Sequence, residues 1–358
     1  MRTRYMMLGS LATLVLAAAT FVVTDIGGPR EASARSGKPR TVRPTVPQTP
    51  SVTTLRGDKQ GNTRTFKLTA SQFTQQLSNF PQKTAQVWGY NKSTPGPTLV
   101  AYRGERIRVV LDNQLPEPTT VHFHGAGAPN RDDGVAGISQ PDPIGTGQSH
   151  TYDFPLRRAG TFAYHSHTRS AVQELRGLDG FLIVLPRREP AAQKVDKDYA
   201  MVLQQFAPPE EGALVAPFPP GTGDFPFSTI NGKTSEATGG PLNVRVGDRI
   251  RIRLYNASNL SHSMHLHGMP FTETAKNGYA IPPQARSPET VVNVAPGEFV
   301  DIRFRMAKPG NWIFHCHVPH HTSNKMKDGY NGAPVGMTRI FHTAGYRPVP
   351  PAYFAYQG

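Results

Sequence analysis

The chain of 358 residues carries a formal net charge of +14, from 39 Lys and Arg residues against 25 Asp and Glu residues. Such an excess attracts anionic substrates or envelope polymers. No nucleic-acid-binding motif accompanies it, so we interpret it as a solubilising or surface-seeking charge. Glycine and proline number 34 each, and long helical periodicity is absent, which favours an all-β protein with many turns. The single cysteine excludes an internal disulfide.

Residues 1–34 are typical of an export signal. Arg2 and Arg4 precede an apolar run at 6–23, and Ala32-Ser33-Ala34 offers a cleavage site. The run is short for a membrane span, and no second run follows. We expect an exported protein, secreted or associated with the cell envelope, with no membrane span in the mature chain. An uncleaved N-terminal anchor is the alternative.

Residues 35–53 are rich in Pro, Thr, Ser and basic residues. A segment of this composition buries too little apolar surface to offset the entropy lost on ordering. It therefore predicts a disordered basic tether.

The remaining part of the chain, roughly 300 residues, suits two domains of about 150 residues each. Short β-branched or alternating runs recur, as at 106–111 and 249–255, and predict strands. We predict a first domain at 54–190 and a second at 191–358, each a β-sandwich.

One pattern occurs twice and supports this division. The segment 104–109 is matched by 247–252, and in both copies the glycine that begins it precedes a His-x-His pair by 18 residues. In each half, a later glycine and four further residues precede a second pair. The offset between the copies is 143 at the first pair and 150 at the second. A repeat of this length indicates two copies of one domain.

Four His-x-His pairs result, and each should place two imidazoles side by side, because residues i and i+2 of a strand share a face. Neutral imidazoles suit copper, zinc, iron or nickel. Four pairs at matching places are hard to explain as ordinary core histidines, so they predict a metal cluster. The eight residues are His122, His124, His165, His167, His265, His267, His315 and His317.

Cys316 narrows the choice of metal. It lies between His315 and His317, so its side chain should face the opposite side of the strand and belong to a different site. A thiolate with two imidazoles and a weak thioether is the ligand set of a blue copper site.

Three further residues can complete this second site. His262 lies three residues before His265, and His321 and Met326 follow Cys316 by five and ten residues. Met337 is the alternative to Met326 as the axial ligand.

The first domain retains its paired histidines but not this mononuclear site. Subtracting the two offsets from the numbers of the four mononuclear-site residues gives their counterparts in the first domain. None of these counterparts is a blue copper ligand: Thr119, Ser166, Ala171 and Arg176. The first domain should therefore supply only half of a shared cluster.

These motifs, over about residues 85–345, resemble those of multicopper oxidases, in the two-domain, laccase-like branch with a type 1 copper in the second domain only. The resemblance implies two cupredoxin-like Greek-key domains and four coppers per chain, namely one type 1, one type 2 and a type 3 pair. It implies one-electron oxidation of phenolic or related reductants, coupled to four-electron reduction of O₂ to water. It also implies a homotrimer whose clusters lie between subunits.

Residue roles follow from the same resemblance. The type 1 ligands would be His262, Cys316, His321 and Met326. The type 2 ligands would be His122 and His265. The type 3 ligands would be His124, His165, His167, His267, His315 and His317. Cys316 would carry electrons to the cluster, and Asp133 is the candidate proton donor, although Asp before Gly is also common in turns.

Three other functions remain open. A copper nitrite reductase is also a trimer of two-domain chains, but it normally carries its blue copper in the first domain and lacks the full set of eight paired histidines. A cuprous or ferrous oxidase would share the same cluster. A copper-storage or copper-resistance protein would predict Met-rich tracts, and the nine methionines form none.

Overall fold

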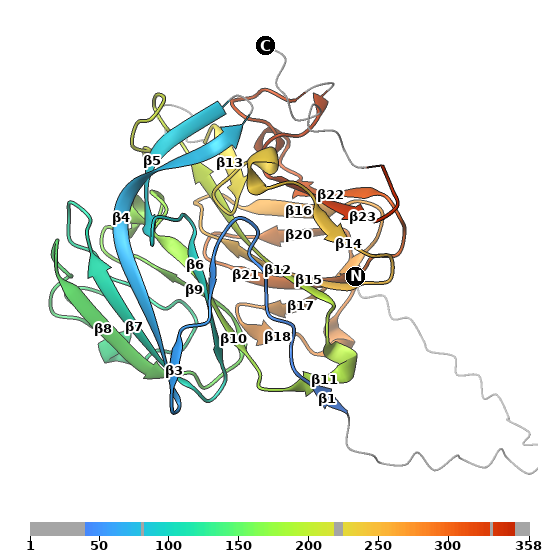
Figure 1. Cartoon of the computed structure of the whole chain (residues 1–358). Coiled ribbons are helices and arrows are strands. Elements are labelled where there is room, and N and C mark those ends of the chain that lie inside the picture. Colours follow the sequence, from blue (N-terminus) through green and yellow to red (C-terminus); the bar gives the residue numbers. More distant parts are fainter. Residues whose placement is uncertain (1–39, 80–81, 218–224, 330–331, 348–358) are drawn as a thin grey trace, which may run out of the picture. The chain divides into compact units, whose positions relative to one another are not determined.

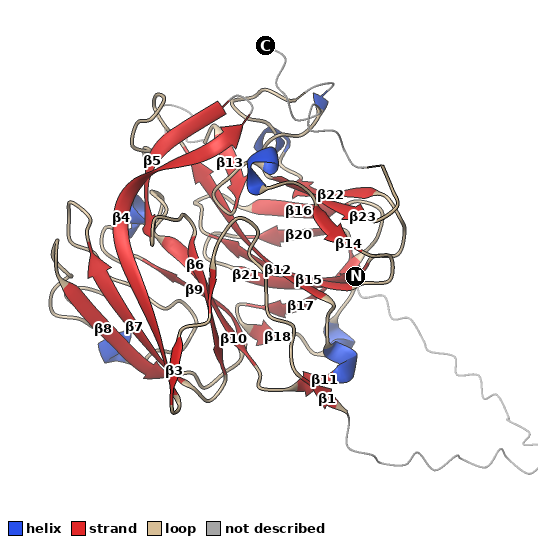
Figure 2. Cartoon of the chain, in the orientation of Figure 1, coloured by secondary structure: helices blue, strands red, loops and turns tan. Residues whose placement is uncertain are grey.

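The computed structural model describes residues 40–79, 82–217, 225–329 and 332–347. The predicted export signal and residues 35–39 of the predicted tether lie outside the described residues. Within the described part, strands dominate and the helices are single turns (Figure 2). The all-β prediction is therefore confirmed. No helix in this part is long and apolar enough to span a bilayer.

The first half of the chain forms two sheets that enclose one core (Figure 1). The first sheet has the order β2 (Thr54–Leu55), β6 (Gly96–Tyr102), β10 (Asp179–Leu185), β9 (Gly160–His165). The second has the order β3 (Asp58–Gln60), β4 (Thr63–Asn79), β7 (Arg106–Asn113), β8 (Ser149–Pro155), with β5 (Gln82–Tyr90) paired to β4. Phe66 and Phe154 from one sheet meet Leu99 and Phe162 from the other.

The second half repeats this arrangement, in yellow to red in Figure 1. Its larger sheet has the order β13 (Phe227–Ile230), β12 (Lys197–Phe206), β15 (Arg249–Asn256), β21 (Phe299–Arg305), β17 (Phe271–Lys276), β18 (Tyr279–Ala280), with β19 (Pro288–Glu289) paired to β17. Its smaller sheet has the order β14 (Leu242–Val244), β23 (Thr338–Thr343), β22 (Asn311–Cys316), β16 (His262–Leu266), β20 (Val291–Val294). Cys316 is fully buried in the core between them.

The two halves share a third core. Phe181 and Ile183 of β10 pack with Val202 of β12 and Tyr255 of β15. Both faces of β10 are covered, so every residue of this strand is buried. A strand covered on both faces reads as a continuous apolar run rather than an alternating one, and the sequence of β10 has this form.

A buried group of charges lies on the same side of the larger sheet. Asp198 of β12 accepts hydrogen bonds from Arg251 at 2.5 Å and from Arg253 at 3.0 Å. Arg253 also contacts Asp301 of the neighbouring strand β21 at 3.2 Å. Thr161 of β9, in the first half, donates to Asp301 at 2.7 Å. The charges are thus paired across three adjacent strands and tied to the other half of the chain.

The prediction of a disordered tether is wrong for residues 40–53, which we call the N-terminal strap. Its strand β1 (Thr41–Val42) pairs with β11 (Glu189–Pro190), and Thr45 donates a hydrogen bond to the Val195 carbonyl. Gln48 exchanges main-chain hydrogen bonds with Asp198 and Ala200 at 2.8 Å. Composition missed this order because the strap is held by the start of β12, which β13 leaves unpaired, and this pairing uses backbone groups rather than apolar side chains.

The buried charges generate a first prediction. We expect Asp198→Asn to destabilise the copper-free protein by about 3–5 kcal/mol, because Arg251 and Arg253 would keep buried charges without a full partner. Burial opposes the charge of Asp198, but Arg253 and Arg251 hold its pKa below the usual range. This stabilisation is therefore present above the unfolded-state pKa of about 4 and is lost as the pH falls through the lower folded-state pKa.

Urea unfolding measures this loss, and Asp196→Asn is the matched control. Asp196 forms a more exposed pair with Arg249, so its replacement should cost less than about 1 kcal/mol. Equal losses for the two variants would contradict the role given to the buried charges.

Candidate metal centres

The mononuclear site consists of His262, Cys316 and His321, all buried. Strand β16 supplies His262, the last residue of β22 is Cys316, and His321 lies in the short helix η5 (Pro319–Thr322). The Cys316 Sγ lies 3.7 Å from His262 Nδ1 and 3.4 Å from His321 Nδ1, and the two nitrogens are 3.2 Å apart. Three soft or borderline ligand atoms therefore converge on one point.

These residues fit a copper ion with a thiolate ligand. Burial lowers the pKa of His262 to about 3 and raises the pKa of Cys316 to about 11, so the neutral His262 ring faces a protonated thiol. A bound cation would replace the thiol proton and draw on the nitrogen lone pairs. The other ring nitrogen of His262 contacts Ser258 Oγ at 2.8 Å, which holds the ring in place.

The assignment of Met326 as axial ligand is wrong. Its side chain is 78% exposed, whereas the mononuclear site is buried. Met337 is fully buried in the same core cluster as Cys316, and its carbonyl accepts a hydrogen bond from the Cys316 amide at 3.1 Å. Met337 is therefore the methionine that the fold brings to this site.

A loop of the chain explains why the ten-residue spacing from Cys316 predicted the wrong methionine. The Thr322 carbonyl accepts hydrogen bonds from Val335 and Gly336, both at 2.8 Å, so the two ends of the segment between them lie side by side. Met337 then bonds to the His321 carbonyl. Gly336 permits this closure, because a Cβ at that position would lie 2.3 Å from the His321 carbonyl oxygen.

The matching place in the first half holds neutral hydrogen-bonding groups instead. Thr119 and Ser166, the counterparts of His262 and Cys316, lie 3.2 Å apart and are fully buried. Both donate to the Gln173 side-chain oxygen, at 2.8 and 2.6 Å. The two positions therefore converge in both halves, but only the second half places metal ligands there.

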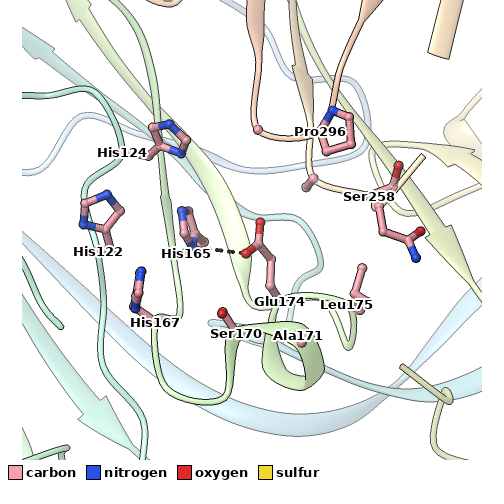
Figure 3. Close-up of a pocket in the computed structure, with 13 residues that line it drawn as sticks. His122, His124, His165, His167, Ser170, Ala171, Glu174, Leu175, Ser258 and Pro296 are labelled. Carbon is pink, nitrogen blue, oxygen red and sulfur yellow. Dashed lines mark ion pairs between the residues drawn. The ribbon is translucent and has the colours of Figure 1, made fainter. Parts of the chain in front are cut away.

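The four paired histidines of the first half form one group, the first quartet: His122, His124, His165 and His167. The ring centroid of His122 lies 5.3 to 5.8 Å from those of the other three. They line a cavity of about 460 Å³ together with Ser258 and Pro296 of the second half (Figure 3). Burial lowers the pKa values of His124 and His165 to about 4, so their rings are neutral at pH 7.

The second quartet, His265, His267, His315 and His317, has a similar geometry. The ring centroid of His265 lies 4.8 to 5.6 Å from the other three. His267 Nε2 and His315 Nε2 approach to 3.1 Å. His267 and His317 are exposed, so this quartet opens to the surface of the single chain.

Backbone carbonyls orient four of these rings in the same way. The Nδ1 of His122 contacts the Asp133 carbonyl at 2.8 Å, and that of His265 contacts the Thr290 carbonyl at 2.7 Å. His165 and His315 each contact the carbonyl of the next residue. A carbonyl can only accept, so Nδ1 donates to it in each ring, and Nε2 is the nitrogen left for a metal. The repeat thus extends to the groups that orient its histidines.

The two quartets do not meet within one chain. Among the described residues, every ring contact between paired histidines joins members of the same quartet. The cavity of the first quartet is lined by no member of the second.

Two carboxyl groups lie beside the first quartet. The predicted Asp133 has its carboxylate 3.4 Å from His122 Nδ1. The adjacent Gly134 allows this approach, since a Cβ there would lie 1.9 Å from the Val121 carbonyl oxygen.

Glu174 is the second acid, and the sequence did not reveal it. Its carboxylate lies 3.3 Å from His165 Nδ1 (Figure 3), and its other oxygen accepts from the Tyr255 hydroxyl at 3.3 Å. Burial raises its pKa to about 7. No spacing rule marks it, because its position depends on the single-turn helix α1 (Ser170–Gln173).

Comparison with known proteins agrees with this geometry. Two multicopper oxidase family models match the chain, over residues 72–189 and 211–331. Laccase-4 of Thanatephorus cucumeris is 31% identical over 52% of this chain and 39% of its own length. A probable nitrite reductase-hydroxylamine oxidoreductase fusion protein of Kuenenia stuttgartiensis is 27% identical over 67% of this chain and 28% of its own length. The chain thus spans less than two fifths of either relative.

A solved structure matches more completely. The multicopper oxidase mgLAC superposes with a TM-score of 0.69 and 30% identity, over 80% of this chain and 88% of that one. The resemblance inferred from the histidine and cysteine motifs is confirmed, and copper is the metal that it implies. The chain belongs to the multicopper oxidase family.

Proposed function

We propose that this protein is a laccase-like oxidase that withdraws single electrons from small reductants and reduces O₂ to water. The observation that carries this proposal is the position of Cys316, which faces the mononuclear site while its neighbours His315 and His317 belong to the second quartet. When bound, copper would supply the one-electron chemistry at the mononuclear site and the four-electron reduction of O₂ at the cluster held by the paired histidines.

His262, Cys316 and His321 would hold the type 1 copper, with Met337 as the weak axial ligand. The eight paired histidines would hold the other three coppers, with type 2 and type 3 roles as inferred from the sequence. The backbone carbonyls that hold Nδ1 and leave Nε2 towards a metal in four of these rings support this assignment.

The reductant would approach η5. His321 itself is buried, but its ring lies against that of His320, with centroids 4.5 Å apart, and His320 is partly exposed. From Cys316, the covalent backbone leads directly to His315 and His317. This route needs no movement of the chain, because β16 pairs with His315 and Cys316 of β22 and its Ser263 carbonyl accepts a hydrogen bond from the His317 amide at 2.6 Å.

Asp133 and Glu174 would hold the protons that water formation consumes. Glu174, with a pKa of about 7, can carry a proton on its carboxyl group beside His165 at neutral pH. Asp133 lies beside His122. Both contact the Nδ1 of a histidine, so both remain clear of the metal-facing nitrogens.

We further propose a homotrimer, in which the first quartet of one chain faces the second quartet of its neighbour. The separation of the quartets within one chain and the exposure of the second quartet support this arrangement. A head-to-tail interface that closes produces such a ring. Export to the cell envelope or beyond is proposed from the N-terminal sequence alone.

The substrate class is tested by O₂ uptake of the copper-loaded protein. We expect a phenol and a dye donor to be oxidised with four electrons consumed per O₂. Faster turnover of Cu(I) or Fe(II) than of the phenol would instead identify a metallo-oxidase. Nitrite consumption without O₂ uptake would overturn the proposal in favour of a nitrite reductase.

The axial ligand is tested by two leucine substitutions. Met337→Leu should raise the reduction potential of the blue copper and alter its visible spectrum, because it removes the weak thioether ligand. Met326→Leu is the matched control and should change neither, because its side chain is exposed. A redox titration distinguishes the two, and the reverse result would restore Met326 as the ligand.

Subunit sharing is tested by co-expressing two inactive variants, His124→Ala and His317→Ala. If clusters form between chains, about a quarter of the interfaces in a random one-to-one mixture should join two intact quartets and recover activity. Each variant alone should be inactive but retain its blue colour. A mixture without recovered O₂ uptake, despite mixed trimers, would show that each cluster lies within one chain.

A further inference from the structure

Arg339 is a buried cation without a counter-charge. It lies on β23, between Met337 and Phe341 of the core, and is 3% exposed. Its Nη2 donates to the Gly240 carbonyl at 2.8 Å. Its Nε and Nη1 are buried and have no hydrogen-bond partner among the described residues. Buried charges in proteins are almost always paired. Within the described part of the chain, this guanidinium therefore lacks both a counter-charge and acceptors for two of its nitrogens.

Arg339 lines a cavity of about 480 Å³ at the edge of the second sandwich. Three other segments complete the cavity: residues 48–51 of the N-terminal strap, the start of β12 and the turn at 238–243. Lys197 of β12 adds a second positive charge, and the described lining contains no carboxylate. The volume is in the range of sites that hold small organic molecules.

Nearby acids do not neutralise the cavity. Asp248 acts on Tyr199 electrostatically, but it does not line the cavity. No described carboxylate lies within ion-pair distance of Arg339 or Lys197. The ordinary ligand for two such cations is an anion with several oxygen atoms.

We propose that this cavity binds a small oxyanion, bearing a phosphate, sulfate or carboxylate group, through Arg339 and Lys197. Because Nε and Nη1 are buried, the Arg339 guanidinium would turn towards the cavity and donate to the anion together with Lys197. The anion would connect the N-terminal strap to β12 and β23. Strand β23 is paired with β22, with Arg339 opposite Phe314. The anion would therefore secure the strand that borders Cys316 without contacting any metal ligand.

Isothermal titration calorimetry of the copper-loaded full chain tests this proposal, with inorganic phosphate and citrate as separate probes at constant ionic strength. We expect one saturable site per chain. Lys197→Gln should weaken binding about tenfold, the value of one charge-assisted hydrogen bond of about 1.4 kcal/mol. Arg339→Gln should abolish it. Binding of citrate but not phosphate would identify the natural ligand as a carboxylate.

Arg305→Gln is the matched control, because it removes the same charge from an exposed residue outside the cavity. Its affinity should equal that of the unaltered protein. Equal binding by Lys197→Gln, or no saturable binding of either probe, would overturn the proposal.

Diffraction from crystals soaked in selenate gives a second readout that does not depend on the folding of Arg339→Gln. An anomalous peak within hydrogen-bond distance of the Arg339 guanidinium would support the site. Peaks at other surface positions alone would show adventitious binding only and would overturn the proposal.

Discussion

Successive residues of strand β22 face opposite sides of its sheet, and the organisation of both metal centres depends on this alternation. Cys316 points into the core of the second sandwich, where His262 and His321 converge on it. His315 and His317 point away and join His265 of β16. Two sites with different ligand chemistry are thus held by adjacent residues, with no side chain between them. The fixed register of β16 against β22 keeps both sites in place.

The two halves show how one framework can carry different chemistry. Both place a pair of residues at the mononuclear position, and both orient their paired histidines through backbone carbonyls. In the first half, Thr119, Ser166 and Gln173 satisfy one another by hydrogen bonds, so this core is complete without a metal. In the second half, two imidazole rings and a thiol converge instead, and a cation is the group that could draw on all three ligand atoms.

Much of this arrangement could be predicted from the sequence, because strand periodicity and a duplicated pattern are local signals. The all-β class and the multicopper oxidase family were predicted and are confirmed. The axial methionine was predicted wrongly. The chain leaves the site at Thr322 and returns to it at Val335, and the spacing of residues along the sequence does not show that such a loop closes. The N-terminal strap was missed because its partners are distant in sequence, so composition does not indicate them. Glu174 was missed because its place beside His165 depends on the single-turn helix α1, which no spacing rule predicts.

The separation of the two quartets is the feature with the widest consequence. In the proposed assembly each quartet would supply half of a cluster, and the single chain keeps the two quartets apart. Native mass spectrometry of the copper-loaded protein tests this account most directly, because it counts chains and metal ions in one species. The account predicts an assembly of three chains that holds four coppers per chain and loses the cluster coppers when it dissociates. A monomer that retains all four coppers would contradict it.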